Sequence, residues 1–313
     1  VKGAGAADWL NAVFANNMPK LVGRSCLTPL IGVRGGIAGD FTVTKLSDDE
    51  FMIIGGGMSE RYHSRFWKMV PLPEGTTFES RTDAMCGFNV AGPKSRELLT
   101  RLTNADLSTA AFPFMRSQQI EIAGVPVVAL RVSFTGDLGW ELHCEQADQL
   151  KLYEALLDAG KAVGAGPVGS RALMSLRVEK GYGSWSREYS PEYWPQEVGL
   201  AGLIKLEKEF LHKDAYLRIK DNAPREVMSL IHVTEVTTAD ATGGEPIFLT
   251  DGTPVGRVSS GTYGYGVEMS LALGYLKGVA AGTEVDVMIL GKPHRGVVLS
   301  EPPFDPKGEK LRA

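Results

Sequence analysis

The sequence predicts an α+β protein: a pseudo-duplicated domain with antiparallel sheets, followed by a small C-terminal β-barrel. The duplication is predicted by two segments, because VKGAGAADWLNAVF at residues 1–14 resembles VAGPKSRELLTRLT at residues 90–103 and strand-like runs follow both. The barrel is predicted from about Glu226 onward, where short apolar runs alternate with turn residues. We therefore expect the duplicated domain over residues 1–222 and the barrel over residues 223–313.

Each half of the duplicated domain reads helix, strand, turn, strand, helix. GGIAGDFTVTKL at residues 35–46 and DEFMIIGG at residues 49–56 supply the strands of the first half. QIEIAGVPVVALRVSF at residues 119–134 supplies those of the second, and it continues through a turn at residues 136–139 into a further strand. The alternation of apolar and polar residues in these runs is typical of strands in antiparallel sheets.

Turn and helix signals divide the rest of the chain. SRALMSLRVEKG at residues 170–181 reads as a helix that ends at Gly181, since glycine often closes a helix in the left-handed conformation. An irregular stretch rich in aromatic residues and proline follows, SWSREYSPEYWPQEVGL at residues 184–200. In the barrel region, Asp251-Gly252 between two apolar runs predicts a hairpin.

Composition excludes several classes of function. The 313 residues carry a formal net charge of −4, with 43% hydrophobic and 22% charged residues, which is ordinary for a globular domain. No long basic run favours a nucleic-acid partner, and no apolar run approaches the length of a membrane span. Three separated cysteines and five isolated histidines predict no metal site. The opening Val1-Lys2-Gly3 suggests a fragment, and any targeting segment would be lost with the missing part. No targeting segment is readable, and we expect a cytoplasmic location if the protein is bacterial and the mitochondrial matrix if it is eukaryotic.

Asp40 is the first carboxylate that could carry chemistry. It follows the glycine-rich run RGGIAG and begins the strand DFTVTKL, where glycines let a ligand or another backbone approach closely. An aspartate there could orient a cationic nitrogen or accept a proton. A turn-capping role is the alternative, and residue pattern alone favours it.

Glu141 is the second such carboxylate. It stands between Trp140 and Leu142 in a strand, so its side chain points away from both. It could be a solvent-exposed strand residue. It could also accept two parallel N–H groups from a planar heterocycle.

A resemblance to a known family bears on this choice. VSFTGDLGWEL resembles the folate-binding hairpin of the glycine-cleavage T-protein (aminomethyltransferase) superfamily, and RGGIAGDFTVTKL resembles the segment that bears its catalytic aspartate. SRALMSLRVEKGYGSWSREYSPEYWPQEVGL is similar to the C-terminal folate-dependent region of dimethylglycine and sarcosine dehydrogenases. EPIFLTDGTPVGRVSSGTYGYGVEMSLALGYL and EPPFDPKGEKLR resemble the terminal barrel of those enzymes.

The resemblance implies an enzyme that uses tetrahydrofolate. In these dehydrogenases an FAD domain oxidises an N-methyl amine, dimethylglycine or sarcosine, to an iminium ion. The T-protein-like region then transfers the one-carbon unit and forms 5,10-methylenetetrahydrofolate. No FAD domain is recognisable in this sequence, so the flavin would belong to a missing domain or a partner subunit.

The resemblance also assigns residues to a site. Asp40 maps to the catalytic acid, and Glu141 maps to the glutamate that grips the pterin ring. The residues that we expect to line the folate pocket are Asp40, Phe41, Thr42, Phe134, Glu141, Leu142 and His143. Phe134 stands where relatives commonly carry a tyrosine, which removes one hydroxyl, and Gly202 stands where another folate-contacting tyrosine is expected.

Two other classes of function stay open. One is a free-standing folate-dependent demethylase that acts on a sulfonium or an aryl methyl ether and needs no flavin. The other is a non-catalytic folate-binding assembly factor. Such factors carry a Lys-Gly-Cys-Tyr-x-Gly-Gln segment where this chain has LEKEFLHKDA at residues 206–215, and the presence of Asp40 also argues against this class.

Overall fold

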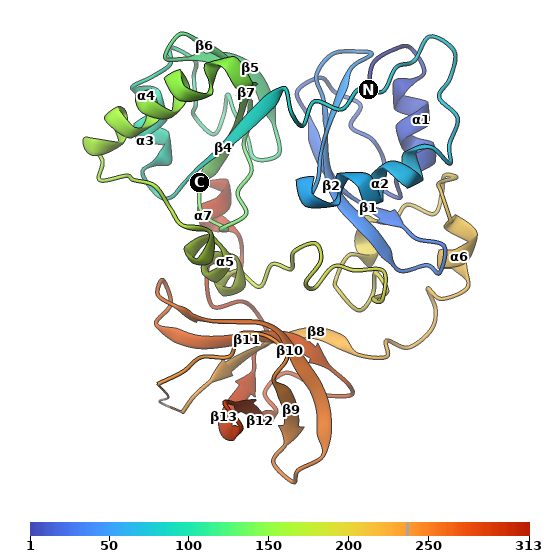
Figure 1. Ribbon diagram of the computed structural model, residues 1–313, viewed down its shortest axis with the longest axis vertical. Coiled ribbons are helices and arrows are strands. Elements are labelled where there is room, and N and C mark those ends of the chain that lie inside the picture. The colour runs from blue at the N-terminus through green and yellow to red at the C-terminus, as the bar shows by residue number, and fades with distance from the viewer. Residues whose placement is uncertain (236–237) are drawn as a thin grey trace.

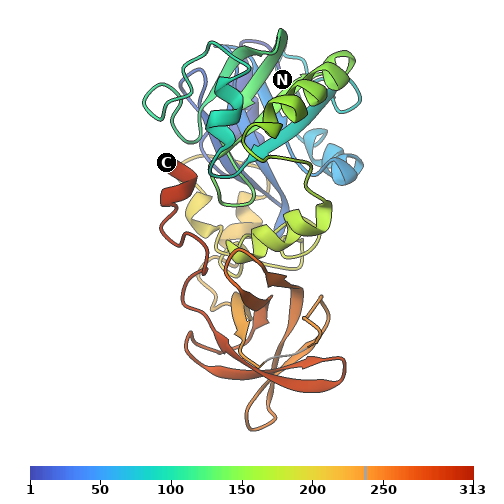
Figure 2. The same ribbon diagram turned by 90° about the vertical axis from the view of Figure 1, so that its left-hand side faces the viewer.

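A computed structural model describes residues 1–235 and 238–313 of the chain. Two α/β lobes stand side by side, and a β-barrel lies below them, as Figure 1 shows. The second view separates the barrel from the lobes along the long axis of the molecule (Figure 2). The α+β class, with a barrel at the C-terminal end, is therefore confirmed.

The first lobe pairs a three-stranded antiparallel sheet, in the order β1-β2-β3, with flanking helices. Its elements are α1 (Ala6–Val13), β1 (Ser25–Ile31), β2 (Ile37–Lys45), β3 (Phe51–Ile54), the short 3₁₀ helix η1 (Gly57–Ser59) and α2 (Glu60–Trp67). The core between α1 and the sheet is aromatic, with Phe14, Phe41 and Trp67 in mutual contact. These large side chains fix which face of β2 is buried.

The second lobe has a four-stranded antiparallel sheet in the order β4-β7-β6-β5. Its elements are β4 (Met85–Ala91), α3 (Ser95–Thr100), β5 (Ser117–Ile122), β6 (Val125–Leu130), β7 (Gly139–Glu145), the 3₁₀ helix η2 (Gln146–Asp148) and α4 (Gln149–Lys161). Trp140, Leu142 and Cys144 on β7 point into the core that α3 and α4 cover. Both lobes thus contain a run of helix, three strands and helix, which repeats as the two similar segments predict but has one strand more than the predicted unit.

An irregular stretch joins the lobes to the barrel. It follows α5 (Ser170–Glu179). Gly181, at φ +69°, lies two residues beyond the helix and closes it, as the sequence signal predicts. We call residues 182–194 the strap, and in Figure 1 the chain after α5 runs between lobes and barrel. The 3₁₀ helix η3 (Ala201–Leu203) and α6 (Lys213–Leu217) lead to the barrel.

The barrel closes through six strands in the order β10-β11-β8-β13-β12-β9. They are β8 (Val227–Val233), β9 (Pro246–Leu249), β10 (Pro254–Gly264), β11 (Met269–Leu276), β12 (Glu284–Ile289) and β13 (Lys292–Val298). Asp251-Gly252 forms the expected β9–β10 turn, with Gly252 at φ +88°. After the barrel, α7 (Glu309–Arg312) returns to the second lobe, where Arg96 donates to the carbonyl of Ala313 at 2.7 Å.

Two expectations about strands need correction. The strand expected to reach Phe134 ends at Leu130, where the chain turns and the backbone N–H of Val132 donates to the carbonyl of Leu130 at 3.1 Å. The sequence reading also missed β1 and β4, which carry polar residues or proline between their apolar ones. Within the described residues, no helix is both long and apolar enough to cross a membrane.

Candidate functional site

Asp40 lies on the central strand of the first lobe, at a point where that strand has one neighbour. It pairs with Pro29 of β1, whereas β3 pairs with β2 only from Thr42 to Lys45. Proline contributes no N–H group, so the backbone around Asp40 is less tied than in the middle of a sheet. Side chains alternate along β2, which places Asp40 and Thr42 on the face opposite Phe41.

Glycines before Asp40 are required by close packing. A side chain at Gly39 would meet the Phe41 ring at 2.5 Å and His63 Nε2 at 2.9 Å. A side chain at Gly36 would meet the carbonyl of Pro191, in the strap, at 2.3 Å. The run RGGIAG therefore lets α2 and the strap press against the strand that carries Asp40.

Burial changes the chemistry of the groups around β2. It raises the pKa of the Asp40 carboxyl to about 6, so the carboxylate is ionised but poorly hydrated at neutral pH. Burial also raises the pKa of the Tyr189 phenol, and the nearby charge of Asp40 raises it further. His63 is neutral because burial lowers its pKa to about 4. Its Nε2 atom is buried and has no hydrogen-bond partner among the residues that the structure describes.

Glu141 lies on β7 of the second lobe, between Asn89 of β4 and Leu130 of β6. Its carboxylate Oε2 is 3.3 Å from Nε2 of His143, two residues further along the same face, and the Glu141 side chain is 23% exposed. The pair can present one free carboxylate oxygen to a ligand while the imidazole orients the other. Leu142 points the opposite way and is fully buried in the lobe core.

A cavity of about 610 Å³ separates the two lobes. Phe41 and His63 line it from the first lobe, and Gly87, Val128 and His143 line it from the second. Its volume suits a cofactor-sized molecule. Two of the seven residues expected in the site, Phe41 and His143, line this cavity. Asp40, Thr42 and Glu141 lie on the strands beside it without lining it, and Leu142 lies behind the sheet.

Phe134 belongs to the connection between β6 and β7 and is partly buried. Gly136 in the same loop, at φ +83°, packs so closely on Lys180 that a Cβ would meet its side chain at 2.6 Å. Lys180 in turn pairs with Asp305 at 3.2 Å, in the segment before α7. The loop of Phe134 is thus fixed by the end of α5 and by the C-terminal segment. Gly202 lies apart, in η3, with open space around it.

Sequence reasoning missed the groups that hold the strap. Arg177 and Glu188 form a buried ion pair at 2.8 Å, and Trp185 donates from Nε1 to Ser59 Oγ at 2.6 Å. The sequence shows an arginine in the helix before this stretch and aromatic residues within it. It does not show which distant residues these side chains contact.

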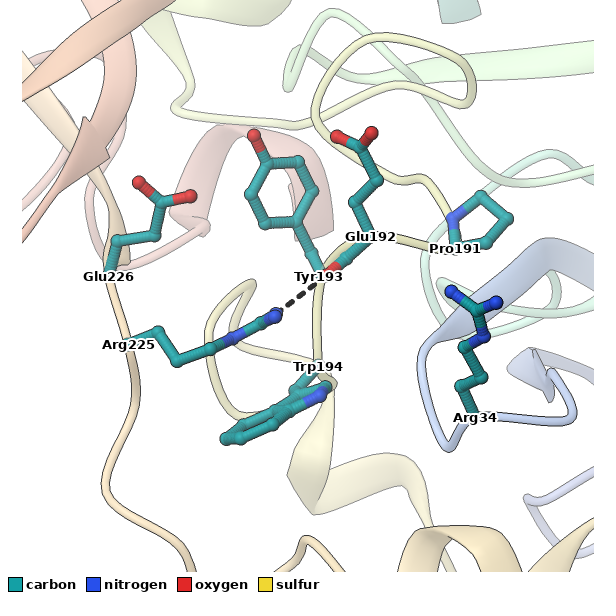
Figure 3. A pocket seen from close by; sticks show the side chains of 7 residues that line it. All are labelled: Arg34, Pro191, Glu192, Tyr193, Trp194, Arg225 and Glu226. Carbon is teal, nitrogen blue, oxygen red and sulfur yellow. Dashed lines mark hydrogen bonds between the residues drawn. The ribbon is translucent and has the colours of Figure 1, made fainter.

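A second cavity, of about 440 Å³, lies between the strap, Arg34 of the first lobe and the two residues before β8 (Figure 3). The guanidinium of Arg225 stacks on the Trp194 ring at 4.2 Å and donates to the carbonyl of Glu192 at 2.6 Å. Arg34 reaches toward it from the first lobe, as the figure shows. None of the seven predicted residues lies there, and Arg225 also pairs with Glu197 at 2.7 Å. These contacts connect the strap to the segment that leads into the barrel, and they indicate a structural role for this region.

Comparison with known proteins decides the family. The family model of the GCVT N-terminal domain matches residues 1–208. The family model of the glycine cleavage T-protein C-terminal barrel domain matches residues 229–305. The chain belongs to the glycine cleavage T-protein family. The boundary that we predict at residues 222 and 223 falls between the two matches and stays a prediction.

Relatives within this family fall into two groups. The chain is 35% identical over 309 residues to dimethylglycine dehydrogenase of Mus musculus, covering 96% of the chain and 35% of that enzyme. It is 28% identical to an aminomethyltransferase of Natranaerobius thermophilus, covering 96% of the chain and 83% of that protein. The crystal structure of aminomethyltransferase T from Bartonella henselae shares its fold, with a TM-score of 0.85 at 22% identity, covering 97% of the chain and 83% of that structure. The chain thus spans about a third of the dehydrogenase that it matches.

Proposed function

We propose that this chain transfers a one-carbon unit from an iminium ion to tetrahydrofolate, forming 5,10-methylenetetrahydrofolate and a demethylated amine. The iminium would derive from dimethylglycine or sarcosine. Membership in the T-protein family supports a folate-dependent transferase. The higher identity to dimethylglycine dehydrogenase than to the aminomethyltransferase, 35% against 28%, supports an N-methyl amine as the source of the carbon.

One observation supports this function most directly: the strand that carries Asp40 and the strand that carries Glu141, one in each lobe, both contribute a residue to the cavity between the lobes. Asp40 is poorly hydrated, so its negative charge would act strongly on a cation held nearby. Glu141 is accessible and is oriented by His143. We propose Asp40 as the catalytic acid and Glu141 as the pterin anchor.

The reaction balances without a further reagent. The two folate nitrogens each lose a proton and bind the methylene carbon, and the amine leaves with both protons. Asp40 would hold the cationic iminium in register with these nitrogens and stabilise positive charge as the bonds form. With a pKa of about 6, it could also accept a proton from one nitrogen and pass it to the leaving amine.

The remaining five predicted residues would shape the folate pocket. Phe41 and His143 line the cavity, and Thr42 shares the face of Asp40. Phe134 would pack against the pterin from the β6–β7 loop. Leu142 would contribute only through its backbone, since its side chain is in the core.

A source of iminium is also part of the proposal. An FAD-containing oxidoreductase, in a further domain of the same polypeptide or in a partner subunit, would oxidise the N-methyl amine. That flavoprotein would select between dimethylglycine and sarcosine, because it acts before the carbon reaches this chain.

The test is the exchange of a ¹³C-labelled methylene group between 5,10-methylenetetrahydrofolate and an added amine, followed by NMR. Sarcosine and glycine are offered in turn, because they are the amines released from the two iminium ions. The enzyme-free reaction sets the baseline. We expect the wild-type chain to exceed it and Asp40→Asn to return to it. Equal rates for the two proteins would contradict the proposed function.

A further inference from the structure

Glu188 anchors the strap to the barrel, and it is fully buried. Its Oε1 atom accepts hydrogen bonds from Ser259 Oγ and Ser260 Oγ of β10, each at 2.7 Å. Its Oε2 atom accepts from Arg177 Nη1 at 2.8 Å and from the backbone N–H of Ser184 at 3.0 Å. Both carboxylate oxygens are therefore saturated by protein donors.

The anchoring network continues on either side of this carboxylate. Arg177 donates a further bond to Ser260 Oγ at 2.6 Å and another to the carbonyl of Tyr182 at 2.8 Å. The phenol of Tyr275, on β11, donates to the carbonyl of Glu188. Two barrel strands and α5 thus hold the same short piece of the strap.

The strap also contacts the first lobe, around the strand of Asp40. The backbone N–H of Ile37, at the start of β2, donates to the carbonyl of Tyr193 at 3.0 Å. The Trp185 ring lies 5.0 Å from that of His63 on α2. Tyr189 follows Glu188 directly, and the nearby charge of Asp40 raises the pKa of its phenol.

We propose that Glu188 is a positioning residue: through it, the barrel holds the strap against the strand of Asp40. The proposal assigns the barrel a part in the transfer site, although none of its described residues lines the cavity between the lobes. It rests on the proposed function only for its kinetic consequence, because the position of the strap can be measured without folate.

Position and burial are linked at Asp40. The carboxyl has its raised pKa because it is shielded from water. Tyr189 on the strap is near enough to Asp40 for the charge of Asp40 to raise the pKa of its phenol. His63 on α2 packs against Phe41, on the opposite face of β2, and Pro29, the partner of Asp40 on β1, carries no charge. Loosening the strap would admit water, and the pKa of Asp40 would fall toward its ordinary value.

The experiment compares two sets of barrel serines. In the double variant Ser259→Ala/Ser260→Ala, Glu188 Oε1 loses both hydroxyl donors while the ion pair with Arg177 remains. The matched control is Ser270→Ala, which removes another buried barrel hydroxyl bonded to a carboxylate, Asp240 at 2.6 Å, with no contact to the strap. The readout is the titration of the Asp40 carboxyl by ¹³C NMR, assigned by its loss in Asp40→Asn.

We expect the titration midpoint of Asp40 to fall by about one pH unit in the double variant and to stay unchanged in Ser270→Ala. An unchanged midpoint in a folded double variant, or an equal fall in the control, would overturn the proposal. If the double variant does not fold, Ser259→Ala alone is measured, and a midpoint within error of the wild type then counts against it.

Activity separates this proposal from the function on which it partly rests. A fallen midpoint together with a weakened transfer rate supports both. A fallen midpoint in a chain that transfers no methylene group leaves Glu188 as a positioning residue and rejects the proposed function. Normal transfer and a normal midpoint in the double variant reject the positioning role alone.

Discussion

The two lobes share an order of elements but surround their carboxylates differently. In the first lobe, Asp40 lies beside the strap on the face of β2 opposite Phe41, and burial raises its pKa to about 6. In the second, Glu141 lies on an accessible face beside an imidazole, with its side chain 23% exposed. A shielded charge acts strongly on a nearby cation, whereas an accessible and oriented one is suited to accept hydrogen bonds. Under the proposed function, the duplicated architecture would separate chemistry from binding.

The largest effect concerns the core of the second lobe. Leu142→Ala removes a fully buried side chain, and we expect the free energy of unfolding to fall by about 2–5 kcal/mol. Chemical denaturation measures this loss. Tetrahydrofolate affinity of the folded variant should stay within about twofold of the wild type, since a lost backbone contact is not expected. A surface-like loss below about 0.5 kcal/mol would show that Leu142 does not belong to the core.

The next effect tests the shielding of Asp40. The folded state binds the Asp40 proton more tightly than the unfolded chain does, so this group costs stability as pH rises from about 4 to about 6. Asp40→Asn removes that cost. We expect it to be more stable than the wild type at pH 7 by about 1–3 kcal/mol, the upper figure being the full shift and the lower allowing for contact with water.

Urea denaturation of both proteins at pH 4 and pH 7 measures this difference. The gain should shrink to about 0.5 kcal/mol at pH 4, because the carboxyl is protonated in the folded chain there and is close to its ordinary pKa of 3.8 in the unfolded chain. A gain of the same size at both pH values would contradict the account, because it would not arise from the ionisation of Asp40.

The smallest effect sharpens the description of the pterin side. Phe134→Tyr adds the hydroxyl that the family resemblance leads us to expect at this position. We expect tetrahydrofolate to bind about 2–10 times more tightly, the value of one added hydrogen bond of about 0.5–1.5 kcal/mol. Calorimetric titration of the two proteins measures the change. Weaker binding by the variant would place Phe134 away from the pterin or in a space too small for the hydroxyl.

The sequence was informative where a local pattern determines structure. The alternation in DFTVTKL places Asp40 on a strand, and the helix that ends at Gly181 lies where its glycine predicts. Alternation also separates Glu141 from Trp140 and Leu142, which are both in the core. Because of that alternation, the side chain of Leu142 cannot lie on the same face as that of Glu141. The family resemblance, taken without the alternation, led us to expect Leu142 in the folate pocket.

Contacts between distant segments could not be read in advance. Glu188 meets serines about seventy residues further along the chain, and Trp185 meets Ser59 more than a hundred residues back. Periodicity gives the face of a side chain and not its partner in another element.

The central claim, that binding and chemistry are divided between the lobes, is tested most directly by calorimetric titration with tetrahydrofolate. The wild-type chain is compared with Glu141→Gln and Asp40→Asn. We expect Glu141→Gln to weaken binding by about 1.5–3 kcal/mol, the value of hydrogen bonds to a charged group, and Asp40→Asn to bind nearly as the wild type does. Normal binding by Glu141→Gln, or a loss of binding confined to Asp40→Asn, would contradict this division.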